Sequence, residues 1–224
     1  MDISLKRIIA YILDILLVTL VATLISQVKF INPNLDKYME TYDEYRELIK
    51  ETESPDTEKI MQMNYDIYRY RTVNSAISIV CLVLYFGLYE FARDGRTLGQ
   101  KAMKLKIVRK NDHKRASFIN YATRIVILNN ILFTMIAMVL VYLLNPKSFY
   151  YAAYVISLFQ SGILLLNVVM IVMRSDRRGL HDMLSNTIVV PEDEELESDE
   201  LVEEKPKKTS IKEKALKKER RQIK

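Results

Sequence analysis

Four long apolar stretches constrain the fold of this chain more than any other feature. They cover residues 8–28, 73–92, 119–144 and 150–173. The hydrocarbon core of a bilayer is ~30 Å thick, so a helix needs about 20 apolar residues to cross it, and each stretch is long enough. A soluble core helix of this length would show a polar face, which these stretches lack. The sequence therefore predicts an all-α, multi-pass protein of the cell membrane with four transmembrane helices.

Basic residues near the ends of the spans predict the orientation. The loop 93–118 carries nine lysines and arginines against only Asp94 and Asp112. The segment 29–72 holds seven basic but ten acidic residues. Because cytoplasmic loops are enriched in lysine and arginine, we expect both termini to be cytoplasmic and segments 29–72 and 145–149 to lie outside.

Two segments outside the spans carry structure of their own. Within the outer insertion 34–72, apolar residues recur at helical spacing, which predicts a helical hairpin on the outer surface. On the inner side, "KLKIVRK" alternates polar and apolar residues, and "SNTIVVP" is rich in β-branched residues. A single strand would leave its backbone groups unpaired, so we expect about 104–109 to pair with 186–190 as a small cytoplasmic β-clip.

The composition changes abruptly after residue 190, which divides a membrane domain at 1–190 from a tail at 191–224. Residues 192–204 hold nine acids and no base, whereas 205–224 hold ten bases and two acids. Charge blocks with too few apolar residues to form a core predict a disordered acidic-then-basic cytoplasmic tail. Its basic half would contact anionic lipid, an acidic partner or the acidic block beside it.

Asp14 lies inside the first apolar stretch, where an unpaired carboxylate costs free energy. Counted from the inner end of each span at 1.5 Å per residue, Asp14, Arg124 and Asn167 share one depth, roughly 7–9 Å below the inner interface. We therefore expect Arg124 to be the counter-ion of Asp14, with Asn167 as a hydrogen-bond partner and Arg7 as the alternative counter-ion. Such a pair would either fix the helices structurally or form part of a transport pathway.

Further polar residues occupy the same spans and form a secondary set. Gln160, Asn167 and Arg174 recur at sevenfold spacing, which places them on one helical face. Glu90 lies at a shallower depth in the second span. Asn130 lies nearer the midplane and adjoins Asn129, so at most one of the two is expected to face inward.

Several short motifs resemble the RDD family of bacterial membrane proteins. They are "KRIIAYILD" at the start, "DGRTLGQKAMKLKIV" after the second span, Arg124, and "RRGLHDMLSNTIVV" after the last span. The resemblance implies that Arg7 and Asp14 are the family's arginine and first aspartate, and that Asp182 is the second aspartate, with Asp94 as the alternative. The chain departs from the family's T-P-G-K at Thr97–Lys101. Membership implies transport, with cation/proton exchange suggested for some members.

Two functions follow from these residues. One is a transporter of ions or small solutes, alone or as a homo-oligomer, in which Asp14 exchanges a proton or monovalent cation. The other is a non-transporting scaffold or accessory subunit that binds anionic headgroups or a cytoplasmic partner. No catalytic residue, cofactor or metal site is expected, because the sequence lacks a phosphate loop, a nucleophile elbow and a Cys/His cluster. Nucleic acid is not an expected partner, because the basic tail has no aromatic residues for stacking.

Overall fold

The computed structural model describes residues 2–51 and 56–192, and most of these residues are helical. The helices are α1 (Ile3–Ser26), α2 (Leu35–Glu51), α3 (Thr57–Leu82), the π-helix η1 (Val83–Tyr89), α4 (Glu90–Ala92), α5 (Leu98–Ala102), α6 (Phe118–Leu128), α7 (Ile131–Leu143), α8 (Pro146–Met173) and α9 (Leu180–Leu184). The strands are β1 (Leu105–Arg109) and β2 (Thr187–Pro191). The chain divides into two units, Met1–Glu192 and Asp193–Lys224, and the predicted tail beyond Glu192 lies outside the described residues.

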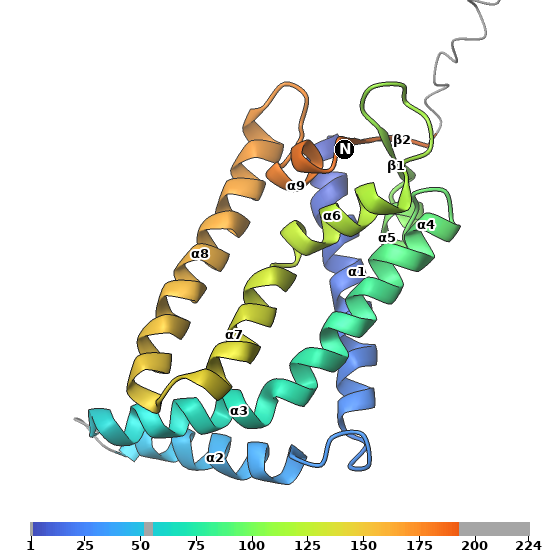
Figure 1. Ribbon diagram of the computed structural model, residues 1–224. Helices are drawn as coiled ribbons and strands as arrows, with labels where there is room; N and C mark the ends of the chain where they lie inside the picture. Colours follow the sequence, from blue (N-terminus) through green and yellow to red (C-terminus); the bar gives the residue numbers. More distant parts are fainter. Residues whose placement is uncertain (1, 52–55, 193–224) are drawn as a thin grey trace, which may run out of the picture. The chain divides into compact units, whose positions relative to one another are not determined.

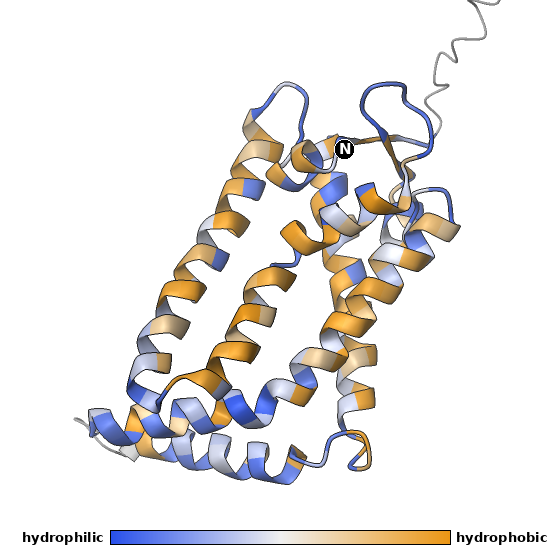
Figure 2. Cartoon of the chain, in the orientation of Figure 1, coloured by the Kyte–Doolittle hydropathy of each residue, from blue (hydrophilic) through white to orange (hydrophobic). Residues whose placement is uncertain are grey.

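Three helices of the described part are long and apolar enough to cross a membrane. They are α1, the continuous run Thr57–Ala92, and α8. The pair α6 and α7 meets the same test together and gives a fourth crossing if it counts as one span. Figure 2 shows mainly hydrophobic colouring along α1, α7, α8 and the second half of the run Thr57–Ala92, and mainly hydrophilic colouring along α2 and the start of α3.

The connecting elements gather at two ends of the bundle. In Figure 1 the N-terminus, α5, α9 and both strands lie at one end, here called the sheet end. At the opposite end, α2 packs along the first turns of α3, which gives the predicted hairpin. Its second arm is not separate from the second span, because α3 continues from Thr57 to Leu82 without a break.

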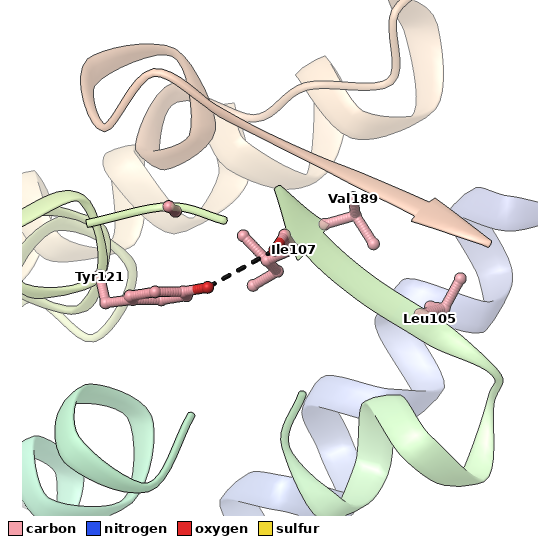
Figure 3. Packing of buried hydrophobic residues seen from close by; sticks show 5 residues of the cluster. Leu105, Ile107, Tyr121 and Val189 are labelled. Carbon is pink, nitrogen blue, oxygen red and sulfur yellow. Dashed lines mark hydrogen bonds between the residues drawn. The ribbon is translucent and has the colours of Figure 1, made fainter. Parts of the chain in front are cut away.

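The two predicted strands pair with each other, which confirms the small sheet. They run antiparallel, with Leu105 opposite Pro191 and Arg109 opposite Thr187. One face of the sheet covers a core whose buried members are Leu105, Ile107, Ala116, Tyr121 and Val189. The Tyr121 hydroxyl donates a hydrogen bond to the carbonyl of Ile107 at 3.5 Å (Figure 3), so this cluster fixes the sheet to the start of α6.

The third predicted span differs from the expected single helix. The segment 119–144 is interrupted at Asn129 and Asn130, and its two halves meet at an angle of 61°. Asn130 adopts a left-handed conformation with φ 53°, which asparagine tolerates better than most side chains. Neighbouring helices bond to both side chains at the break: the Tyr11 hydroxyl donates to Asn129 Oδ1 at 3.0 Å, and Asn130 Nδ2 donates to the Gln160 carbonyl at 3.3 Å.

Candidate functional site

Three charged residues from distant parts of the chain meet at the sheet end and form an arginine–aspartate triad. Arg7 in α1 and Arg124 in α6 each donate to one carboxylate oxygen of Asp182 in α9. All three residues are buried, and the Asp182 side chain is 0% exposed. Burial opposes ionisation of Asp182, but the two guanidiniums outweigh it and hold the pKa of this carboxyl well below its usual range. Asp182 therefore remains ionised at neutral pH and binds α9 to α1 and α6.

A second buried contact lies beside the triad and holds α9 to α8. Asn167 Oδ1 accepts hydrogen bonds from the His181 backbone N–H at 3.2 Å and from His181 Nδ1 at 2.6 Å. Asn167 Nδ2 donates to the Ile163 carbonyl at 2.9 Å, so this amide has its orientation set from both sides. Burial, aided by the neighbouring guanidiniums, lowers the pKa of His181 to about 3. His181 is therefore neutral at physiological pH, with the proton on Nδ1.

Because His181 is neutral in the folded protein, we expect acid to destabilise the fold. The ordinary histidine pKa is 6.5 and the folded value is about 3. Between these two values the unfolded chain holds one more proton at this residue than the folded chain. Stability should therefore fall as the pH drops from 6.5 toward 3, by up to roughly 1.4 kcal/mol per pH unit. Thermal melts in detergent across this range would measure the slope.

The matched variant is His181→Asn, whose amide places a donor near the position of Nδ1 and does not titrate. It should melt with a shallower pH dependence than the natural chain over the same interval. Equal slopes for the two proteins would show that His181 is not the residue whose protonation sets the acid sensitivity.

Asp14 does not contact Arg124, so the predicted ion pair is wrong. Its carboxylate is 2% exposed and accepts three hydrogen bonds from neutral donors. The donors are the Tyr85 hydroxyl at 2.6 Å, the Thr97 hydroxyl at 2.5 Å and the Gly99 backbone N–H at 2.7 Å. Both candidate counter-ions, Arg124 and Arg7, bind Asp182 instead. Equal depth in the membrane therefore does not identify an ion pair, because it does not specify the direction in which a side chain points around its helix.

The segment that holds Asp14 is the short helix α5 and its cap. Thr97 and Gln100 form a capping box, in which the Thr97 hydroxyl accepts from Gln100 N–H and Gln100 Oε1 accepts from Thr97 N–H. Gln100 Nε2 also donates to Glu90 Oε1 at 2.8 Å, and Glu90 is 1% exposed. The capping box thus lies between two buried carboxylates, Asp14 on α1 and Glu90 on α4.

A cavity of about 110 Å³ lies next to these groups. Such a volume is large enough for several water molecules or a small solute. Its polar lining comes from Arg7, Asp14, Gln100, Arg124, Asn167 and His181, and its remaining walls are mainly apolar. The cavity therefore joins the two halves of the site, the triad with its histidine on one side and Asp14 with α5 on the other.

The secondary residues divide between this site and the rest of the bundle. Glu90 belongs to the site through Gln100, whereas Asn130 and Gln160 meet each other at the helix break. Arg174 is exposed and pairs with Asp176 at 2.9 Å, so it takes no part in the buried layer. Asp94, the alternative second aspartate, is likewise on the surface and pairs with Arg115 at 3.3 Å.

Residues that sequence reasoning missed complete the site: Tyr85, Thr97, Gly99 and Gln100. The capping-box pattern, a threonine followed three residues later by glutamine, would have placed a helix start at Thr97. A Cβ at Gly99 would lie 2.2 Å from the Ala10 carbonyl oxygen and 2.8 Å from Asp14 Oδ1. Only glycine therefore allows α5 to approach α1 this closely.

The described residues form apolar helices of membrane-spanning length, with a small sheet at one end and a buried charged layer. These features define a polytopic helical membrane protein. A sequence model of the RDD family matches residues 4–186, a range that contains the triad, Asp14 and α5. The chain belongs to the RDD family. Searches of curated proteins and of solved structures gave no significant match.

Proposed function

We propose that this protein carries a small cation, a proton or a small solute across the cell membrane, with Asp14 as the coupling carboxylate. In this proposal α6 and α7 form one bent span, so the chain crosses four times with both termini cytoplasmic. The observation that carries the proposal is that Asp14, buried on the wall of a cavity, has no cationic partner within the described residues.

An ionised carboxylate inside a membrane protein needs compensation for its charge. The three groups that donate hydrogen bonds to Asp14 are neutral and add no positive charge. A proton or a monovalent cation arriving through the cavity would supply it. The hydroxyl oxygens of Tyr85 and Thr97 both lie within 2.6 Å of the carboxylate. They are hard oxygen ligands, the type that alkali cations prefer. Exchange of one cation for the other at Asp14 would couple their movements.

The broken third span supports the same proposal. Discontinuous helices line the binding sites of many transporters, because backbone irregularity within a membrane is tolerated where it borders protein or a polar cavity. The break at Asn129 and Asn130 leaves the buried Asn130 Oδ1 without a hydrogen-bond donor from the described residues. Leu128, the last residue of α6 before the break, lines the same cavity as Asp14.

The test is ion-dependent proton flux in vesicles that contain the purified protein and a trapped pH-sensitive dye. The natural chain should exchange protons against a gradient of Na⁺, Li⁺ or K⁺, and Asp14→Asn should reduce this flux by about tenfold or more. Asparagine retains the acceptor for Tyr85 and Gly99, and the Thr97 hydroxyl can rotate to accept from the new amide, so the variant should fold.

The matched control is Asp36→Asn, which removes an exposed carboxylate of α2 that pairs with Lys29 at 2.8 Å. Its flux should equal that of the natural chain. Vesicles of the natural chain that show no flux with any of the three cations would contradict cation exchange.

The alternative function is a non-transporting scaffold or accessory subunit. The observation that favours it is the triad, in which one carboxylate holds two guanidiniums and joins α1, α6 and α9 without need of a ligand. In that case the basic sheet end would engage headgroups or a cytoplasmic partner, and the natural chain would insert and fold normally but move no cation.

A further inference from the structure

A groove at the sheet end adjoins the site described above and shares only Thr97 with the residues named there. Tyr89, Arg93, Arg96, Thr97, Leu98 and Lys101 line it, at the point where the second candidate span ends at Ala92. Three of these six side chains are cationic, and carboxylates are absent from the lining. We infer that this groove binds the phosphate headgroup of an anionic phospholipid.

The cations of the groove differ in how far they are already neutralised. Arg93 and Lys101 are exposed and form no ion pair within the described residues. The Arg93 guanidinium lies over the Tyr89 ring at 5.7 Å, which orients it without neutralising its charge. Arg96 pairs with Glu192, and its Nε donates to the Arg93 carbonyl at 3.3 Å. Two uncompensated positive charges therefore remain for an anion.

Exposed apolar residues in the groove and on the helix that leads to it favour a lipid over a soluble anion. Leu98 in its lining is 47% exposed. On the helix that leads to the groove, Val80, Leu84 and Leu88 are 55%, 51% and 49% exposed and recur every four residues. In Figure 2 the end of this helix nearest the groove is coloured mainly hydrophobic, and the loop after it hydrophilic. An acyl chain along the apolar residues would bring its headgroup to Arg93 and Lys101.

The aromatic residues place the groove at headgroup depth. Tyr85 and Tyr89 stack with their ring centroids 5.4 Å apart, directly before the end of the span. Tyrosine is enriched where the hydrocarbon core meets the headgroups, because its ring is apolar and its hydroxyl polar. Thr97, which lines the groove, also donates a hydrogen bond to Asp14 at 2.5 Å, so the groove lies directly beside the buried carboxylate. The lipid site does not depend on transport, since its charges and apolar surface would serve a scaffold equally.

The test is native mass spectrometry of the full chain in detergent, titrated with phosphatidylglycerol or with phosphatidylcholine. The natural chain should bind the first phosphatidylglycerol more tightly than phosphatidylcholine. The double variant Arg93→Gln/Lys101→Gln should lose about 30-fold in phosphatidylglycerol affinity, because each basic side chain at an anionic surface contributes about 1 kcal/mol. Its phosphatidylcholine affinity should not change.

The matched control is Lys110→Gln/Lys114→Gln, which removes the same two charges from the turn after β1 at the same end of the bundle. Its affinity for phosphatidylglycerol should stay within about threefold of the natural value. Equal losses in both double variants would mean that the lipid responds to net charge alone and would overturn the groove as a site. Displacement of phosphatidylglycerol by soluble glycerol phosphate at similar concentration would overturn the lipid as the ligand.

Discussion

Asp182→Asn is expected to lower the stability of the folded protein by about 3–5 kcal/mol. The substitution leaves two buried guanidiniums, those of Arg7 and Arg124, with no carboxylate between them. Removing one partner of a buried ion pair is costly because the remaining charge keeps its desolvation penalty, and here two like charges would also repel. The helix signal in circular dichroism, followed during heating or titration with a denaturing detergent, would measure the loss.

Double-mutant cycles would test the pairing itself. Asp182→Asn and Arg124→Gln should be strongly non-additive, because the second change removes one of the charges that the first leaves unpaired. Asp14→Asn and Arg124→Gln should be additive within about 0.5 kcal/mol, because Asp14 bonds to Tyr85, Thr97 and Gly99 instead. The reverse pattern would restore the Asp14–Arg124 pair and reject the triad.

Gly99→Ala is the second change with a large expected effect, about 3 kcal/mol or more. The new methyl group would lie 2.2 Å from the Ala10 carbonyl oxygen, an atom that moves only if α1 moves. Inserting a methyl group into close-packed structure costs about 1–3 kcal/mol, and more where backbone must shift. The separation would also lengthen the 2.7 Å hydrogen bond from Gly99 N–H to Asp14, so flux should fall together with stability.

Gly162→Ala is the matched control for this change. A Cβ at Gly162, in the middle of α8, would meet no atom within 4 Å. Alanine should stabilise this helix by about 0.5–1 kcal/mol, because it restricts the unfolded chain more than glycine does. Thermal melts of the two variants would separate them, and a Gly99→Ala protein as stable as Gly162→Ala would exclude close contact between α5 and α1.

Local patterns predicted much of this fold. Apolar length identified α1, the second span and α8, because a bilayer demands long apolar helices whatever their partners. Alternation and β-branching identified β1 and β2, and the need to pair backbone groups joined them correctly. The depth count along the spans also had value, since Asp14, Arg124 and Asn167 all line one cavity.

Local sequence patterns could not predict how each helix is rotated about its axis, nor the break at Asn130. Asp14 and Arg124 share a depth, yet Arg124 turns toward α9, a short helix that no hydropathy pattern places. The break between α6 and α7 depends on one residue adopting a left-handed conformation, in a stretch whose composition is that of an uninterrupted span. Both features depend on tertiary partners that are distant in sequence, such as Gln160 for Asn130.

The triad also sets an order of events during biosynthesis. Arg7 and its acidic partner are separated by 175 residues. At a translation rate of roughly 5–20 residues per second, about 9–35 s pass between the two leaving the ribosome. During this interval α1 lies in the translocon or the bilayer without Asp182, and the Arg7 guanidinium is solvated at the interface. Native closure of the bundle comes only after α9 is made, and nascent chains stalled earlier should be the ones that membrane quality control removes.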